Sequence, residues 1–135
     1  MADWKDLLAH VRSSYNIAEE GDGVLRLDFT LARGRAQMVV VTHHTLMGRR
    51  PGAPSGDKEE WAQVEAPIST MDEKLLPKLV RATSYKVCGG IGSKGDLVTY
   101  KYAFPLKNFD GGEFDTALIT VLATAQELAA YIIED

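Results

Sequence analysis

In the segment of residues 24–31 the chain alternates, from Leu25 onward, between apolar and polar side chains. Leucine or phenylalanine occupies positions 25, 27, 29 and 31, and charged or hydroxyl residues occupy positions 26, 28 and 30. This period of two is typical of a strand with one face buried. A second strand, 36–46, follows a turn at Arg33-Gly34-Arg35, and a third spans about 60–68. Consecutive strands without a helix between them favour an antiparallel sheet.

Two segments with helical periodicity frame these strands. Residues 3–15 place apolar side chains at i, i+3, i+4 and i+7 from Trp4, behind Asp3 as a cap. Thr70-Met71-Asp72-Glu73 has the residue types of a capping box, which predicts a second helix after it. Because Pro77 would remove a hydrogen bond inside that helix, we expect either a kink at Pro77 or a helix that begins near Leu76.

The remainder of the chain predicts two more strands and a long helix. The strands are 85–88 and 97–106 around a glycine-rich loop, and the helix runs from Asp110 as its cap to about Ile133. The predicted order is α-β-β-β-α-β-β-α, an α+β fold with a mainly antiparallel five-stranded sheet packed with helices. Residues 1–135 form a single domain, and the Gly- and Pro-rich stretch at about 48–58 is predicted to be a mobile loop.

Composition excludes several classes of protein. With 45% hydrophobic residues the chain can form a core, and with one cysteine, Cys88, it has no disulfide framework. The net charge of −4 argues against a nucleic-acid partner. No apolar run approaches the ~20 residues that span a bilayer, and residues 1–6 do not resemble a signal peptide. We therefore expect a cytoplasmic protein with no membrane association.

No motif in the sequence predicts catalysis, a metal site or a cofactor. Residues 90–95 read Gly-Ile-Gly-Ser-Lys-Gly, but a dinucleotide-binding motif needs a helix after it, and a strand is predicted there. A hairpin connection is the better interpretation. His43 and His44 are neighbours on a strand and point to opposite faces, and His10 lies on the polar flank of the first helix. We predict no catalytic, metal-binding or cofactor-binding residues, and no enzyme activity.

The last helix carries more apolar surface than one sheet can cover. Its main stripe, predicted to lie in the core, contains Phe114, Ala117, Leu118, Val121, Leu122, Ala125, Leu128, Ala129 and Ile132. A second stripe contains Ile119, Ala123, Gln126, Ala130 and Ile133, and it leaves only a narrow arc for polar residues, among them Thr116 and Thr124. Either another helix of the chain covers this second stripe, or the stripe is an interface with a subunit or partner.

With this element order, the chain resembles the YbjN-like family, which shares its fold with the type III secretion chaperones. The resemblance lies in the strand Val98-Thr99-Tyr100-Lys101-Tyr102-Ala103-Phe104-Pro105-Leu106, the turn through Phe109, and the helix Phe114-Asp115-Thr116-Ala117-Leu118-Ile119-Thr120-Val121-Leu122-Ala123-Thr124-Ala125. It implies a small cytoplasmic α+β protein without catalytic residues that is often dimeric and binds other proteins.

Two functional hypotheses follow. The first is a non-enzymatic, chaperone-like protein that forms a homodimer and binds another protein chain. The alternative is a small-molecule-binding protein or enzyme with a pocket between sheet and helices, near Tyr100, Tyr102 and the 90–95 segment.

Overall fold

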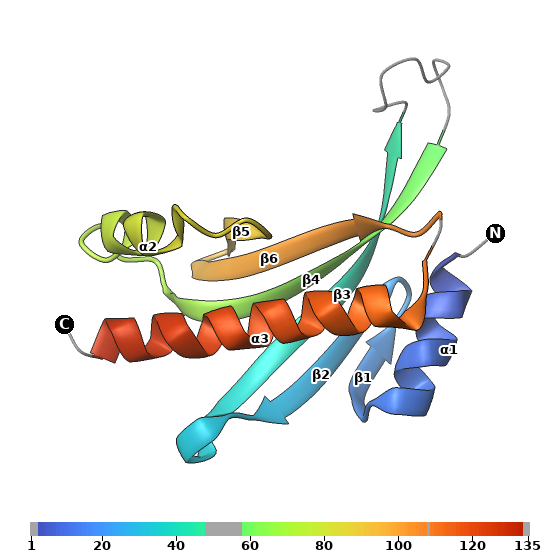
Figure 1. Cartoon of the computed structure of the whole chain (residues 1–135), viewed down its shortest axis with the longest axis horizontal. Coiled ribbons are helices and arrows are strands. Elements are labelled where there is room, and N and C mark those ends of the chain that lie inside the picture. The colour runs from blue at the N-terminus through green and yellow to red at the C-terminus, as the bar shows by residue number, and fades with distance from the viewer. Residues whose placement is uncertain (1–2, 48–57, 108, 134–135) are drawn as a thin grey trace.

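Six strands form one sheet in the computed structural model, which describes residues 3–47, 58–107 and 109–133. The strands are β1 (Ile17–Gly21), β2 (Val24–Thr30), β3 (Ala36–Met47), β4 (Lys58–Thr70), β5 (Gly90–Lys94) and β6 (Leu97–Pro105). Their order across the sheet is β1-β2-β3-β4-β6-β5, and every neighbouring pair is antiparallel (Figure 1). The predicted loop at 48–58 lies outside the described residues apart from Lys58.

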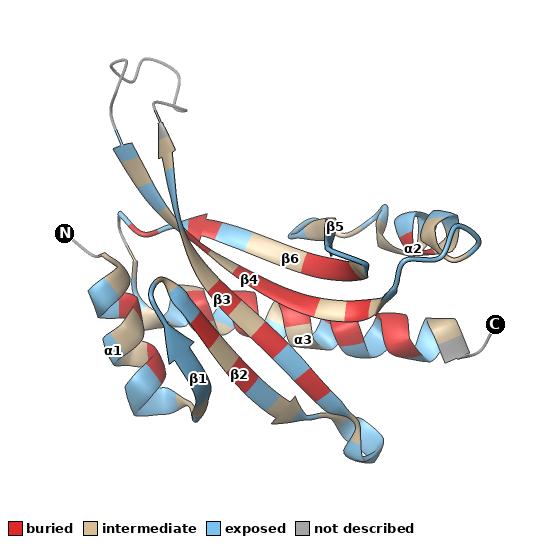
Figure 2. Ribbon diagram, turned by 180° about the vertical axis from the view of Figure 1, so that it is seen from behind, coloured by how far each residue is buried: buried red, intermediate tan, exposed pale blue. Residues whose placement is uncertain are grey.

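Three α-helices accompany the sheet, and the longest covers one of its faces. They are α1 (Trp4–Ser14), α2 (Leu76–Thr83) and α3 (Gly111–Ile133), and a short 3-10 helix, η1 (Ala32–Gly34), forms the predicted turn between β2 and β3. α3 runs across the sheet, α1 lies near β1, and α2 lies near β5 (Figure 1). From behind, the strands lie in front of α3 and no helix crosses them (Figure 2). The predicted α+β class is confirmed.

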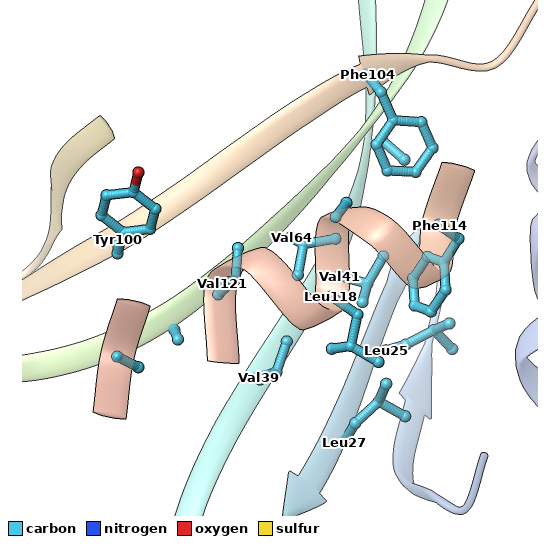
Figure 3. Packing of buried hydrophobic residues seen from close by; sticks show 14 of the residues in the cluster. Leu25, Leu27, Val39, Val41, Val64, Tyr100, Phe104, Phe114, Leu118 and Val121 are labelled. Carbon is cyan, nitrogen blue, oxygen red and sulfur yellow. The ribbon is translucent and has the colours of Figure 1, made fainter. Parts of the chain in front are cut away.

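The core lies between α3 and the sheet. Alternate residues of the central strands, including Leu25, Val41 and Val64, are fully buried and face α3 (Figure 3). Phe114 and Leu118 of α3 meet them with 0% and 1% of their surface exposed. Each Å² of apolar surface removed from water stabilises the fold by ~25 cal/mol, so the burial between α3 and the sheet is the main favourable contribution to folding.

The opposite face of the sheet has no helix over it among the described residues. Because Met38-Val39-Val40-Val41 is apolar throughout, both faces of β3 are expected to be covered. Val39 and Val41 are buried in the core, but Met38 on the other face is 37% exposed and Val40 is only half-buried. This face is the open side of a two-layer structure.

The prediction of five strands is wrong, because β1 is a sixth. The strand pairs with β2 through a two-residue turn at Asp22-Gly23, where Gly23 has a φ of 70°. Its sequence, Ile-Ala-Glu-Glu-Gly, shows no alternation, and four of its five residues are exposed. A bulge between Ile17 and Glu19 interrupts the pairing further. Hydrophobic periodicity therefore does not reveal it.

The strand predicted at 85–88 is also wrong, since β5 lies a few residues later. Residues 84–89 form turns and irregular structure, and the glycine-rich segment interpreted as a loop is itself the strand. Only Gly95 and Asp96 form the turn to β6, and Gly95 has a φ of 59°. The rejection of a dinucleotide-binding motif is consistent with this hairpin, because a strand follows the glycines.

The second helix begins near Leu76, the second of the two predicted alternatives. Pro77 lies in the first turn of the helix, where backbone N–H groups have no acceptor within the helix. The N–H that proline lacks therefore costs no helical hydrogen bond. The predicted capping box is not used: the N-cap is Leu75, which makes no side-chain capping bond. Asp72 instead accepts a hydrogen bond from the backbone N–H of Lys74 at 2.8 Å, within the preceding turn.

Candidate binding surface

The start of α3 is fixed by a predicted cap and by a close contact with α1. The Asp110 carboxylate accepts a hydrogen bond from the N–H of Glu113 at 2.9 Å, as expected of an N-cap. The ring of His10 packs directly on Gly111, and a Cβ added there would lie 2.5 Å from Cε1 of His10. Glycine suits this position because any side chain would have to displace the His10 ring.

The core side of α3 follows the prediction, with one exception. Seven residues of the main stripe are buried: Phe114, Ala117, Leu118, Val121, Ala125, Leu128 and Ala129. Leu122 and Ile132 are half-buried. Thr124, predicted on the polar arc, is instead 3% exposed. The core contact of α3 is therefore wider than its apolar residues alone indicate.

The second stripe of α3 faces solvent. Ile119 is 64% exposed, and Ala123, Gln126 and Ala130 are also exposed. We refer to these four residues as the α3 contact face. The side chain of Ile133 lies outside the described residues. No element of the described chain covers these four residues, so the first sequence-based alternative does not hold for them.

The spacing and composition of the α3 contact face suit another polypeptide segment. Positions 119, 123, 126 and 130 follow a 4-3-4 spacing, which is the seam of a helix that packs against another helix. The two alanines allow a close approach. Of the eight exposed residues in the described part of α3, only Glu127 is charged. A helix side that merely faces water usually carries many charges.

Two open grooves flank α2 where it meets the C-terminal half of α3. The first has a volume of about 300 Å³ and is lined by Ala82, Tyr85, Glu127, Leu128, Ala130 and Tyr131. The second, about 240 Å³, is lined by Asp72, Lys74, Leu75, Lys78 and Ile132. Ala130 belongs both to the α3 contact face and to the first groove, so the two form one continuous surface. Tyr85 and Tyr131 contribute exposed rings beside it, 72% and 40% exposed.

An ion pair fixes one wall of the first groove. Nζ of Lys86 lies 2.6 Å from Oε2 of Glu127 and 5.4 Å from the centre of the Tyr85 ring. The hydrogen bond to Glu127 raises the pKa of Lys86 above its ordinary value. The one charge on the exposed side of α3 is therefore paired within the chain.

A polar cluster that sequence reasoning missed joins α1 to α3. Asp115 accepts hydrogen bonds from Nε2 of His10 at 2.9 Å and from the Tyr15 hydroxyl at 2.7 Å. The rings of Phe109, Phe114 and Tyr15 lie edge-on to His10, with centroids 6.0–6.4 Å away. His10, predicted on the polar flank of α1, is half-buried by these contacts. No sequence signal was available, because the bonded residues lie about 100 positions apart.

Protonation equilibria in this cluster reflect its hydrogen bonds. Burial, followed by the hydrogen bond to Asp115, raises the pKa of Tyr15 to about 12. Burial also raises the pKa of Asp115, but the hydrogen bonds from His10 and Tyr15 outweigh it, so the net shift is downward. The cluster has the residue types of an acid–base site, but Gly111 and three aromatic rings enclose the imidazole. Its contacts hold α1 against α3, and we refer to the hydrogen-bonded group of His10, Tyr15 and Asp115 as the clasp.

The other histidines do not converge. His43 stacks on Trp4 with ring centres 5.2 Å apart and lies 3.2 Å from Glu60, whereas His44 contacts Thr42. They lie on opposite faces of β3, as predicted. In the described residues no group of three or more His, Cys, Asp and Glu side chains is placed to hold a metal ion.

The region around Tyr100, predicted as an alternative pocket, contains a buried ring. Tyr100 has no exposed surface, and its hydroxyl donates a hydrogen bond to the carbonyl oxygen of Cys88. Burial raises its pKa. Ile91 of the glycine-rich segment packs against the same core.

Comparison with protein-family models and with curated proteins finds no match for this chain. None of the helices in the described part of the chain combines the length and apolarity needed to cross a membrane.

Proposed function

We propose that this chain is a non-enzymatic, chaperone-like protein that forms a homodimer and binds another protein chain through the α3 contact face. The observation that carries the proposal is the exposed, nearly uncharged seam of α3. An apolar face of this kind lowers the free energy of the system when a second chain removes it from water. The first groove extends the surface toward α2 and offers two exposed tyrosine rings to an incoming side chain.

A protein partner fits this surface better than a small molecule does. Small ligands bind in concave sites that enclose most of their surface. Both grooves beside α2 are open, and the position predicted for an internal pocket is occupied by the buried Tyr100 ring. The alternative of a small-molecule-binding protein or enzyme therefore has less support.

The architecture is compatible with the proposed YbjN-like, type III secretion chaperone-like relationship. Apart from β1, the elements follow the order α-β-β-β-α-β-β-α. A cytoplasmic location belongs to the same proposal, and the exposed free thiol of Cys88 is consistent with a reducing compartment.

A charge placed on the α3 contact face tests the proposal. The assay follows the light scattering of an aggregating, heat-denatured model protein in the presence of the chain. We expect the wild type to suppress aggregation near equimolar ratios and Ile119→Asp to lose most of this effect, because a buried charge opposes the contact. Ala9→Asp is the matched control: it adds the same charge at an exposed helical position of α1, outside the α3 contact face, and should behave as the wild type.

Circular dichroism of both variants establishes that they fold, since both positions are exposed. Equal suppression by Ile119→Asp and Ala9→Asp would show that the α3 contact face is not the binding surface.

A further inference from the structure

The two edges of the sheet differ in how they are protected. β1 carries Glu19 and Glu20, is interrupted by a bulge, and is tied to α1 by an ion pair between Glu20 and Arg12. These features are those by which proteins block pairing at an edge. β5 at the opposite edge has neither a bulge nor an acidic residue: its pairing with β6 is regular, and its one charged residue, Lys94, lies at the end of the strand beside the turn.

The outward-facing backbone groups of β5 belong to Ile91 and Ser93. In an antiparallel pair, hydrogen-bonded and non-hydrogen-bonded positions alternate. Lys94 and Leu97 flank the two-residue turn and therefore form a hydrogen-bonded pair. Every second residue back along β5 is hydrogen-bonded to β6 in the same way, which applies to Gly92 and Gly90. The N–H and C=O of Ile91 and Ser93 therefore point away from β6. Among the described residues, no backbone–backbone hydrogen bond joins Ile91 or Ser93 to another segment.

We infer that β5 is a self-pairing edge and that two copies of the chain join through antiparallel β5–β5 contact. This inference rests on the proposed homodimer and gives it an interface. A two-fold axis at Gly92 places Ile91 opposite Ser93 of the partner subunit, so all the outward groups of both residues are paired. Such isologous pairing uses the same surface twice and closes after two copies.

Side chains favour this register. Gly92 sits on the axis, in a non-hydrogen-bonded pair whose Cα atoms approach to about 4.5 Å, the closest spacing in a sheet. Lys94 faces Gly90 of the partner subunit, so the two lysines do not oppose each other. Because β1 is blocked, pairing stops at a continuous twelve-stranded sheet (six strands from each copy). The α3 contact face is not used in this pairing and remains free for the partner protein.

The first experiment measures the dimer dissociation constant by sedimentation equilibrium. Ser93→Pro removes an outward N–H from each copy and leaves the bonds to β6 intact, so we expect the dissociation constant to rise about 100-fold. Ser93→Ala keeps the N–H and should dimerise as the wild type. A dimer that Ser93→Pro leaves unchanged overturns the β5 interface but leaves the homodimer standing.

The second experiment fixes the register and does not depend on the folding of the proline variant. In a Cys88→Ser background, Gly92→Cys should form a disulfide-linked dimer, because the paired Cα atoms fall within disulfide range. The new side chain meets only the flexible end of Lys101. Ser93→Cys is the matched control: its Cα atoms lie roughly 8 Å apart in this register, too far to cross-link.

Three further results would overturn the inference. Cross-linking of both cysteine variants to the same extent, or of neither, contradicts the proposed register and interface. A wild type that stays monomeric overturns both this interface and the proposed homodimer. The aggregation assay on Ile119→Asp is independent of these outcomes and tests the α3 contact face separately.

Discussion

Removal of the Asp115 carboxylate should destabilise the protein, because it holds α1 against α3. Asp115 accepts hydrogen bonds from His10 and Tyr15. Hydrogen bonds to charged groups contribute about 1.5–3 kcal/mol when buried. Since 39% of the Asp115 side chain is exposed, we take about 1 kcal/mol for each. Asp115→Ala should therefore lower the free energy of unfolding by about 2 kcal/mol.

Urea unfolding followed by circular dichroism measures this change, with the denaturant slope expected to stay constant. Asp28→Ala is the matched control, since Asp28 is 54% exposed and makes one long contact of 3.4 Å with Arg26. It should cost less than about 0.5 kcal/mol. If Asp115→Ala stays within that limit, or if Asp28→Ala costs as much, the clasp does not stabilise the fold.

The same carboxylate predicts a pH dependence. The pKa of Asp115 is lowered in the folded chain, so the unfolded chain takes up this proton first as the pH falls. Its contribution to stability is present above the unfolded pKa of about 4 and is lost as the pH falls through the folded pKa. Asp115→Asn should flatten the fall of unfolding free energy in this acidic range. An unchanged slope would contradict the role of the ionised carboxylate.

Three further perturbations test other parts of the fold. Leu118→Ala, at a core position 1% exposed, should cost about 3 kcal/mol in urea unfolding, whereas Ile119→Ala beside it, 64% exposed, should cost little. Gly89→Ala should lower the melting temperature by several degrees, because Gly89 has a φ of 84° and an added Cβ would lie 2.7 Å from the Tyr100 ring. Because burial and Asp115 raise the pKa of Tyr15 to about 12, its contribution to stability is present below the unfolded pKa of about 10 and is lost as the pH rises toward 12. Ultraviolet titration should show a late tyrosine step that Tyr15→Phe removes.

Strong periodicity explains which elements the sequence predicts correctly. β2 alternates without interruption, and α3 keeps helical spacing along most of its length, so burial on one side alone determines both. β1 and β5 lack that signal. β1 is almost wholly exposed, and β5 contains two glycines in five residues, so each depends on pairing with a neighbouring strand.

The candidate binding surface could be predicted in part. The helical wheel of α3 places Ile119, Ala123 and Ala130, with the polar Gln126 among them, outside the main stripe, but it does not show whether the chain itself covers them. That depends on where α1 and α2 pack, which follows from contacts distant in the sequence. The His10–Asp115 contact is of the same kind, since no local pattern brings the first helix to the start of the last.

Thiol protection tests most directly whether the α3 contact face binds a protein chain. In a Cys88→Ser background, Ala123→Cys places one thiol on that face, and Asp28→Cys places one on an exposed strand position as the reference. The rate of reaction with a thiol reagent is measured with and without an excess of a permanently unfolded, reduced and carboxymethylated model protein. We predict that the unfolded protein slows the reaction at position 123 several-fold and leaves position 28 unchanged. Equal rates at position 123 with and without the unfolded protein would contradict the proposed function.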